Sequence, residues 1–281
     1  MRPAHAFRLL RTVLLAALLV ACAPVERLFA SDAEPWPRWQ TNDATSTIEV
    51  DHRAWDRFLA RYLQRDAAGI NLMEYAAVTG EDRAALKAYL GVLAATSVSR
   101  LNRTEQFAFW VNLYNALTVS TVLEHYPVKS IRDIDISPGL FSVGPWGAKM
   151  IHVEDMPLSL DDIEHRILRP LWRDPRTHYA LNCASLGCPN LQAHAYRAQT
   201  LDADLDAAAR AYVNSPRGAR FEGGHLLVSR LYQWYVADFG GNDVGIITHL
   251  TRYAQPDLAR QLATFHAIED GGYDWSLNAA R

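Results

Sequence analysis

Two cysteines, Cys183 and Cys188, are the residues whose type and spacing most directly suggest chemistry in this chain. They lie in the segment THYALNCASLGCPNL, in which His178 precedes Cys183 by five positions. A thiol pair at this spacing can form a disulfide, supply a nucleophile with a structural neighbour, or contribute to a metal site. Any chemistry of the chain is therefore expected here, and the surrounding elements must decide its kind.

The residues HYALNC read as a buried strand that opens into a loop ending at Cys188. Successive side chains of a strand face opposite sides, so His178 and Cys183 would point away from each other. A thiol at a strand end that opens into a loop of small residues lies where catalytic groups are common. Its base is then expected to be His165, or His178 if the strand is bulged.

The predicted helix at residues 102–126 carries polar groups into the core. Asn102 followed by Glu105 resembles a capping box, and the run that follows is apolar nearly all round up to a proline. Such a helix is expected to be buried centrally. At 100° per residue, Glu105, Asn112 and Asn115 share one stripe. Each would cost roughly 1–3 kcal/mol if left unpartnered, so these side chains either bind neighbouring backbone or join a site.

A second helix is predicted in SLDDIEHRILRP, with Ser159 as its N-cap and Pro170 as its end. Glu164 lies on the apolar face, where a carboxylate needs a cationic or hydrogen-bonding partner such as an arginine. His165 lies at the edge of the same stripe. It is either a histidine satisfied by structural contacts or the base of a catalytic thiol.

The remaining segments predict further helices and one hairpin. Apolar residues at three-and-four spacing indicate the helices, and two adjacent glycines indicate the hairpin turn. These helices cover residues 52–64, 80–96, 202–213, 230–239 and 243–254, the hairpin covers 219–229, and segment 273–278 is expected to dock back on the domain. The chain length allows one ordinary core, so we predict a single helix-rich α+β domain around a small central β-sheet, spanning residues 47–281.

The N-terminus predicts export. A leader with three arginines precedes the apolar run TVLLAALLVA, which is about half the length needed to span a bilayer. The run ends in LVAC, which resembles the lipobox of bacterial lipoproteins. Residues 1–21 are therefore predicted as a signal peptide and Cys22 as the lipid-bearing first residue of the mature chain. Ordinary secretion with cleavage after Ala30 is the alternative, and Ala23 favours the outer membrane by resemblance to the lipoprotein sorting rule.

Composition limits the partners. Residues 22–46 contain three prolines and no sustained period, which predicts a tether between lipid and domain. The formal charge is −3, and without the three arginines of residues 1–21 it becomes −6, with 25 basic and 31 acidic residues. No basic cluster favours nucleic acid or anionic lipid. We expect membrane contact through the lipid on Cys22, no cofactor, and an unidentified small-molecule or envelope partner.

Five motifs together resemble the family called domain of unknown function 547: WVNLYNAL, SLDDIEHRILRP, HYALNCASLGCPNL, SRLYQWYVADFG and YDWSLN. The resemblance runs from about Thr104 to Asn278 and implies no reaction or substrate. Some relatives resemble fusions to glutaredoxin-like domains or occur in plant and animal cytosol. The family pattern marks Asn112, Tyr114, Asn115, Glu164, His165, His178, Cys183, Ser185, Cys188, Pro189, Trp234, Tyr235, Asp238 and Phe239.

The first hypothesis for the cysteine segment is a thiol-dependent hydrolase or transferase. Cys183 would attack an acyl or related electrophile after His165 or His178 removes its proton. Glu164 or Asn115 would orient that base.

The other hypotheses need no thiol nucleophile with a histidine base. An oxidising exported compartment favours a Cys183–Cys188 disulfide, structural or redox-active, although relatives in reducing compartments argue against a purely structural bond. A metal site from the two cysteines with His178 and His194 lacks the short Cys-x-x-Cys spacing of zinc sites, so no metal is predicted. The fourth hypothesis is a non-catalytic envelope binding or assembly module.

Overall fold

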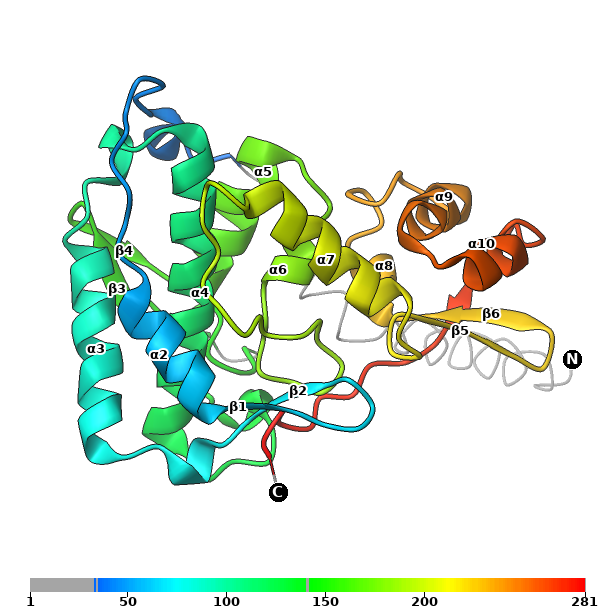
Figure 1. Ribbon diagram of the computed structural model, residues 1–281, viewed down its shortest axis with the longest axis horizontal. Helices are drawn as coiled ribbons and strands as arrows, with labels where there is room; N and C mark the ends of the chain where they lie inside the picture. Colours follow the sequence, from blue (N-terminus) through cyan, green and yellow to red (C-terminus); the bar gives the residue numbers. More distant parts are fainter. Residues whose placement is uncertain (1–32, 34, 140–141, 281) are drawn as a thin grey trace, which may run out of the picture. The chain divides into compact units, whose positions relative to one another are not determined.

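The computed structural model describes residues 33, 35–139 and 142–280. The predicted signal peptide, Cys22 and the first part of the predicted tether lie outside these residues. The α-helices are α2 Arg53–Tyr62, α3 Gly80–Ala94, α4 Arg103–His125, α5 Arg169–Trp172, α6 Thr177–Ala180, α7 Leu201–Val213, α8 Arg230–Trp234, α9 Asp243–Tyr253 and α10 Pro256–Leu262 (Figure 1). The strands are β1 Leu63–Arg65, β2 Asn71–Met73, β3 Ile151–Val153, β4 Met156–Leu158, β5 Ala219–Glu222, β6 His225–Val228 and β7 Glu269–Asp270.

Helix α4 forms the centre of the core. It begins at the Asn102 cap, whose side chain accepts from the Glu105 N–H, and every residue from Glu105 to Leu123 is buried. Helices α2, α3 and α4 lie side by side in Figure 1, and α3 packs against both of the others. A helix that is apolar nearly all round is stable only when neighbours cover every face. The predicted central burial of this helix is therefore confirmed.

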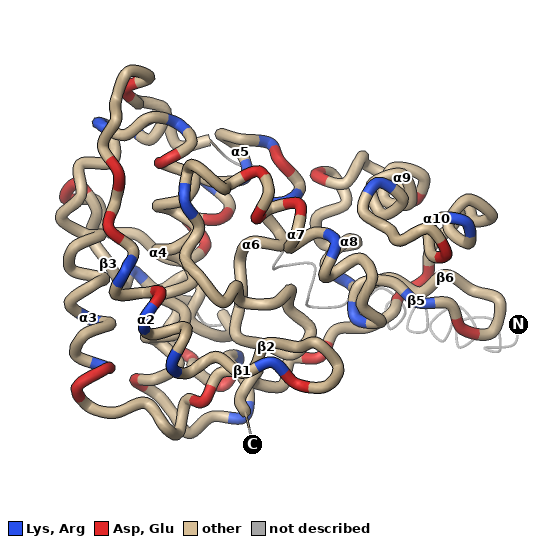
Figure 2. Tube along the Cα trace, in the orientation of Figure 1, with Lys and Arg blue, Asp and Glu red and all other residues tan. Residues whose placement is uncertain are grey.

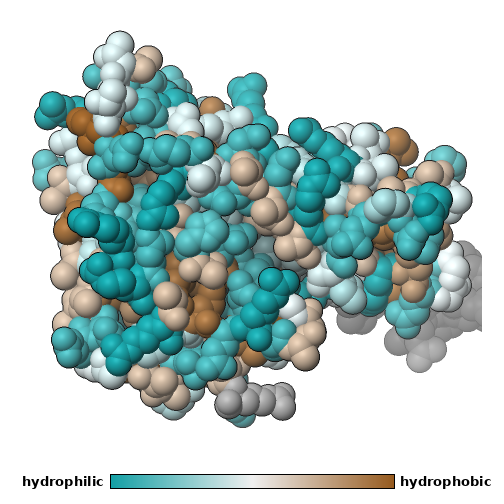
Figure 3. Space-filling model, in the orientation of Figure 1, coloured by the Kyte–Doolittle hydropathy of each residue, from teal (hydrophilic) through white to brown (hydrophobic). Residues whose placement is uncertain are grey.

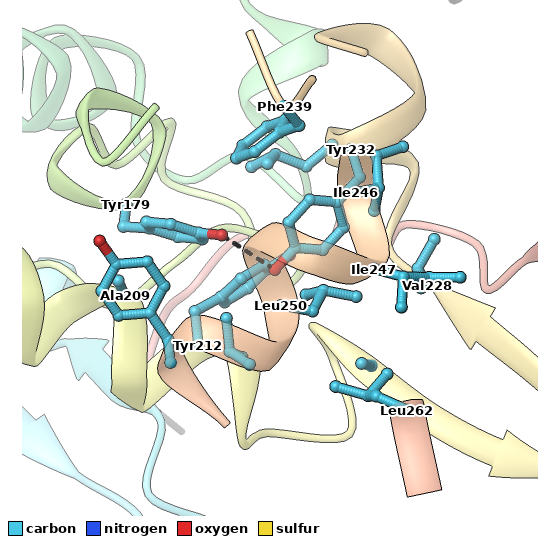
Figure 4. Close-up of a cluster of buried hydrophobic side chains, with 14 of the residues drawn as sticks. Tyr179, Ala209, Tyr212, Val228, Tyr232, Phe239, Ile246, Ile247, Leu250 and Leu262 are labelled. Atoms are coloured by element: carbon cyan, nitrogen blue, oxygen red, sulfur yellow. Dashed lines mark hydrogen bonds between the residues drawn. The ribbon is translucent and has the colours of Figure 1, made fainter. Parts of the chain in front are cut away.

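A second group of buried side chains joins α6, α7, α8 and α9. Tyr179, Tyr212, Tyr232 and Phe239 pack there with Leu250 (Figure 4). The hydroxyls of Tyr179 and Tyr232 are 3.2 Å apart and hydrogen-bonded. Because buried phenols need such partners, this aromatic group fixes how α6 lies against α7 and α8.

The strands form small separate sheets. β1 pairs with β2 and β3 with β4, both antiparallel, while β6 lies between antiparallel β5 and parallel β7. The turn between β5 and β6 uses Gly223 and Gly224, both at positive φ, as predicted for the hairpin. The helix-rich α+β class is confirmed, but the described strands form three small sheets rather than one central sheet.

Several predicted helices are present, and one is shorter than predicted. The helices expected at 52–64, 80–96, 202–213 and 243–254 correspond to α2, α3, α7 and α9. The helix expected at 230–239 ends at Trp234 and continues as turns, in which the Asp238 N–H donates to Tyr235 and the Phe239 N–H to Val236. This change of backbone path lets the Asp238 carboxylate face α5 and α6.

Part of the segment predicted as a tether packs on the domain. A short 3₁₀ helix covers Pro37–Gln40, and Trp39 is 3% exposed and lies against Trp110. The Trp36 N–H also donates to the carbonyl of Arg166. Aromatic burial therefore ties this segment to the core before residue 47. None of the helices in the described residues is long and apolar enough to cross a membrane.

Candidate functional site

The helix predicted at 159–170 contains a π-helical stretch. Ser159 and Asp162 form a reciprocal cap, because each side chain accepts from the other's backbone N–H. Residues Asp162–Leu168 are π-helical, and the Arg169 N–H donates to the carbonyl of Glu164. π-Helical turns are rare and concentrate at functional sites.

Pro170 does not end this helix, contrary to prediction. The π stretch shifts the hydrogen-bond ladder so that Pro170 falls in the first turn of α5, and the helix continues to Trp172. Proline is tolerated there because its missing N–H would have no intrahelical partner.

His178 lies on a helix rather than on the predicted strand. Residues Thr177–Ala180 form the single turn α6, followed by extended backbone at Leu181. The Thr177 and His178 N–H groups donate to Asp174 and Pro175, which fixes this turn. The β-favouring residues of HYALNC are thus overridden by local hydrogen bonds and by burial of the Tyr179 ring.

The turn α6 brings His178 into a buried ionic network, here called the histidine–carboxylate cluster, that comprises Asp161, Glu164, His165, Arg169, His178 and Asp238. His178 Nε2 lies 2.7 Å from Asp238 Oδ2, and its Nδ1 lies 3.6 Å from Glu164 Oε1. The ring stacks on Tyr235 with centroids 4.0 Å apart. Both nitrogens of His178 therefore face carboxylates.

Arg169 links the two histidines of the cluster. Its Nε donates to Asp238 Oδ2 at 2.6 Å, and Nη1 donates to His165 Nδ1 at 3.0 Å. His165 thus accepts at Nδ1, which leaves Nε2 to face Asp161 Oδ1 at 3.7 Å. Asp238 is thereby paired with Arg169 as well as with His178.

The charges of the cluster determine its protonation. Burial opposes ionisation of Glu164, but neighbouring His165, the hydrogen bond from His178 and the charge of Arg169 lower its pKa to about 2. Burial likewise opposes ionisation of Asp238, and its bonds to His178 and Arg169 outweigh this and lower its pKa. Burial lowers the pKa of His165, and the nearby charges of Arg169 and His178 add to this. Two carboxylates are therefore held ionised beside Arg169 and His178.

Asp161 behaves differently from the other members. Burial of its carboxyl, together with the negative charges of Glu164 and Asp162, raises its pKa to about 7. Yet 46% of its side chain is exposed. Asp161 is therefore the member of the cluster that meets solvent and changes charge near neutral pH.

The cysteines occupy a tight loop after α6. Ala184 has φ +59, a left-handed conformation that turns the chain back so that Cys188 meets Cys183. The two Sγ atoms are 2.6 Å apart, and the Cys183 N–H donates to Cys188 Sγ at 2.9 Å. Both residues are free thiols. Cys188 is 4% exposed, whereas Cys183 is only partly buried.

Hydroxyl groups surround the sulfur of Cys183. Ser185 Oγ and Tyr273 Oη each lie 3.1 Å from it, and these two oxygens are 3.0 Å apart, so that the Ser185 hydroxyl can donate to either the sulfur or the phenol. Burial opposes a thiolate, but the hydrogen bonds from Cys188, Ser185 and Tyr273 lower the pKa of Cys183. Burial and the neighbouring Cys183 sulfur raise the pKa of Cys188. The pair thus favours one thiolate, on Cys183.

The backbone of the loop is already hydrogen-bonded. The Ala184 N–H donates to the Asn182 side chain, and the N–H groups of Leu186 and Gly187 donate to Ser276 and Asp274. The Cys188 N–H donates to Ser185. Free N–H groups aimed at a developing oxyanion are the usual support for acyl transfer, and here these donors are engaged.

The structure distributes the predicted site residues over two places. Glu164, His165 and His178 meet in the histidine–carboxylate cluster, and within the described residues neither imidazole forms a hydrogen bond with Cys183. The phenol of Tyr114 lies near both groups. Its burial raises its pKa, and the negative charges of Glu164 and Cys183 add to this.

The polar stripe of α4 holds backbone in place. Asn112 donates to the Tyr196 carbonyl and accepts from its N–H. Asn115 donates to the Ala180 carbonyl and accepts from the Asn182 N–H. Glu105 accepts from the Val50 N–H. Asn115 therefore supports the start of the cysteine loop rather than orienting a histidine.

The four residues of the metal hypothesis do not meet. His194 lies on the surface beside Asp204, and His178 is held by carboxylates. Across the described ranges, no three His, Cys, Asp or Glu side chains are arranged to hold a metal ion.

Three residues of the site were not identified from sequence. Arg169 follows His165 by four positions, a spacing that places both on one helix face. Tyr273 belongs to YDWSLN, which was expected to dock on the domain. Docking is confirmed, since the Asn278 N–H donates to Ala184 and the Leu277 N–H to Lys129. No sequence pattern distinguished Asp161, because an acidic residue at an exposed helix position is common on protein surfaces.

Fold and site together define a helix-rich α+β domain with a dithiol centre beside a buried histidine–carboxylate cluster. The family model described as "Protein of unknown function, DUF547" matches residues 98–213, from just before α4 to the end of α7 and including both cysteines. Over these residues the chain is similar to this family, as its motifs predicted. No curated protein and no solved structure matches the chain.

Proposed function

We propose that the protein is a dithiol redox protein in which Cys183 attacks and Cys188 resolves. The observation that carries this proposal is the pairing of a partly exposed Cys183 with a buried Cys188 at an Sγ–Sγ distance of 2.6 Å. The lowered pKa of Cys183 and the raised pKa of Cys188 support the same division of roles. Such asymmetry suits stepwise exchange, because one thiol must react first and the other must wait.

The reaction proceeds by two exchanges. The Cys183 thiolate attacks one sulfur of a substrate disulfide, so that a mixed disulfide forms and the other substrate sulfur leaves as a thiolate. Cys188 then loses its proton and attacks Cys183 Sγ, which releases the second substrate sulfur. The protein ends as a Cys183–Cys188 disulfide, and two electrons pass to the substrate, whose two thiolates take up the proton lost by Cys188 and a second proton from solvent. The reverse sequence oxidises a substrate dithiol.

The hydrolase or transferase hypothesis has less support. It requires an imidazole within hydrogen-bond reach of the thiol. Here His178 is held between Glu164 and Asp238, and His165 accepts from Arg169. The neighbours of Cys183 are instead a second thiol and two hydroxyls, which stabilise a thiolate without removing substrate protons.

The proposed location is the periplasmic side of a bacterial membrane, with the outer membrane favoured. This rests on the predicted signal peptide and on lipidation of Cys22. Thiol pairs in such oxidising compartments exchange with protein and small-molecule disulfides. The envelope partner would accordingly be a disulfide or dithiol, reached from the lipid anchor.

A stoichiometric titration tests the proposal. Each protein carries Cys22→Ser, is reduced, freed of reductant and mixed with excess 5,5′-dithiobis(2-nitrobenzoate). The parent protein should release two equivalents of thionitrobenzoate and finish as an internal disulfide, seen by intact mass. Cys188→Ser should release one equivalent and retain the adduct, whereas Cys183→Ser should react slowly because Cys188 is buried.

Two results would contradict the proposal. If the parent protein retained two adducts, Cys188 would not act as a resolving thiol. If Cys183→Ser reacted as fast as Cys188→Ser, the assigned order of the two thiols would be wrong. Retention of full cellular function by Cys183→Ser would instead support a binding module.

A further inference from the structure

A second polar site lies away from the thiols, in a pocket of about 530 Å³ between the β1–β2 turn and the C-terminal end of α7. We call it the arginine pocket. Its charged walls are Arg65, Arg210 and Arg217, and Tyr253 and two prolines supply apolar surface. The volume lies within the range of small-molecule sites. The pocket is therefore large enough for a small organic ligand.

The charged residues that line the arginine pocket are all positive. None of its thirteen residues is Asp or Glu, although the chain as a whole is acidic. Among the described residues, Arg65, Arg210 and Arg217 form no ion pair. Figure 2 shows blue segments on the β1–β2 hairpin and near the end of α7, where two of these arginines lie. A concave surface lined by one sign of charge concentrates its field on a ligand of opposite sign.

Three carboxylates that lie next to the lining in sequence or one helical turn away are engaged elsewhere. One of them, Asp257, pairs with Arg260. Asp66, beside Arg65 in the β1–β2 turn, accepts from the Ile70 N–H. Asp206, one turn before Arg210, pairs with Arg176. None of the three lines the pocket. The positive charge of the pocket is therefore not neutralised by its immediate surroundings.

Arg217 connects the pocket to the cysteine loop. Its Nη1 donates to the carbonyls of Leu186 and Cys188 at 2.9 and 2.7 Å, and Nη2 donates to Asn190 at 2.9 Å. These bonds to neutral oxygens fix the guanidinium at the pocket wall and leave its charge uncompensated. Arg65 and Arg210 are exposed, so each can swing toward a ligand.

We propose that the arginine pocket binds a small organic molecule with two or more phosphate or carboxylate groups. The guanidinium groups of Arg65 and Arg210 can each match the oxygens of a phosphate or carboxylate in bidentate geometry. Arg217, whose donors are largely engaged, adds positive charge at the wall, so the cavity suits more than one anionic group. The Tyr253 ring, with Pro216 and Pro256, would contact the carbon skeleton. This site does not depend on the thiol chemistry proposed above.

Isothermal titration calorimetry at 0.15 M NaCl tests the site, with pyrophosphate as the phosphate probe and citrate as the carboxylate probe. The full-length chain should bind at least one probe with one-to-one stoichiometry, and the probe that binds identifies the preferred anion. Arg65→Gln and Arg210→Gln should each weaken binding and raise the dissociation constant about tenfold, as expected for one lost charge-assisted hydrogen bond. Arg57→Gln is the matched control, because Arg57 is an exposed arginine of α2 that does not line the pocket.

The outcomes are distinguishable. Absence of binding to both probes at 10 mM, or equal weakening by all three substitutions, would overturn the proposal, since equal weakening reports only net charge. Circular dichroism confirms that each variant is folded. A Cys183→Ser, Cys188→Ser double variant should bind like the parent, so failure of the redox proposal leaves this test unaffected.

Discussion

The cysteine pair and the histidine–carboxylate cluster are both buried polar groups, but they stabilise charge in opposite ways. Glu164 and Asp238 face Arg169 and His178, so that negative charge is met by cationic or hydrogen-bonding side chains of matching number. The sulfur of Cys183 meets neutral groups instead, from Cys188, Ser185 and Tyr273. Neutral donors lower the pKa of the thiol without fixing its sulfur in an ion pair, whereas paired ions are held in place.

This difference suggests separate roles for two regions that lie on either side of Tyr114. The histidine–carboxylate cluster holds α5, α6 and the turn at Asp238 together, while the cysteine loop carries the reactive atom. The face of the molecule that Figure 3 shows is largely hydrophilic. The predictions below test this division, starting with the largest expected effect.

Removing the central cation should break the cluster. Arg169→Met keeps the apolar stem but removes the guanidinium that donates to the Asp238 carboxylate and to His165, while Asp238 retains His178. We expect the free energy of unfolding to fall by about 3–5 kcal/mol, as for other buried pairs that lose one partner. Urea denaturation at pH 7 measures it. Arg53→Met, which breaks the exposed pair with Asp51, should cost less than about 1 kcal/mol, and equal losses would show that the cluster is well solvated.

Acid should weaken the cluster through Glu164. Its folded pKa of about 2 lies below its ordinary value of 4.5, so its contribution is present above pH 4.5 and is lost as the pH falls toward 2. By linkage this contribution is on the order of 3 kcal/mol, since each pKa unit corresponds to about 1.4 kcal/mol. Glu164→Gln should therefore flatten the stability curve between pH 4.5 and 2, measured by urea denaturation. Glu124→Gln is the control: Glu124 forms an exposed pair with Lys87, so this variant should keep the parent's dependence of stability on pH. If Glu164→Gln kept that dependence as well, the lowered pKa assigned to Glu164 would be wrong.

Removing a hydroxyl should slow the thiol. Tyr273→Phe deletes a donor to Cys183 Sγ, so the pKa of Cys183 should rise and less thiolate should be present at pH 7. We expect iodoacetamide to alkylate Cys183 roughly tenfold more slowly, the equivalent of one hydrogen bond of about 1.4 kcal/mol. Peptide mapping by mass spectrometry gives the rate. Tyr126→Phe changes a phenol that stacks on Tyr75 and should leave the rate unchanged, and a parental rate in Tyr273→Phe would sink the hydroxyl-supported thiolate.

The smallest effect is expected at Asp161. Because its folded pKa of about 7 is raised, the ionised carboxylate destabilises the fold, and stability falls as the pH rises through 7. Asp161→Asn removes that penalty and should raise stability at pH 8 but hardly at pH 4. Nearly half of the side chain is exposed, so solvent screening limits the gain to about 1 kcal/mol. Thermal unfolding at the two pH values measures it, and an equal gain at both would contradict the raised pKa.

Much of the fold could be predicted from the sequence, but less of the site. Helices α2, α3, α4, α7 and α9 follow apolar spacing and capping residues, which act over one or two turns. The turn α6 is four residues long, too short for periodicity to appear, and its fold depends on contacts of His178 and Tyr179 with distant elements. Residue spacing likewise does not predict the π stretch, and Glu164 on it meets His178, which lies on α6.

The residues of the site could be predicted only in part, because many of them come together from distant positions in the sequence. Cys183 and Cys188 are near in sequence, so their pairing was a hypothesis from the start. His178 meets Asp238 from 60 positions away, and Cys183 meets Tyr273 from 90 positions away. Such pairings require the relative placement of helices, which residue spacing does not contain. His165 and His178, predicted as bases for Cys183, therefore lie in the histidine–carboxylate cluster instead.

The order of synthesis gives the contact between Tyr273 and Cys183 a consequence for biogenesis. Both cysteines leave the ribosome about 90 residues before the phenol that completes their surroundings. Until then, neither Tyr273 nor the backbone partners at Asp274 and Ser276 can hold the loop. The nascent chain thus presents two thiols whose reactivity is not yet set by the finished site, and an oxidant met at that stage would act on them before folding is complete.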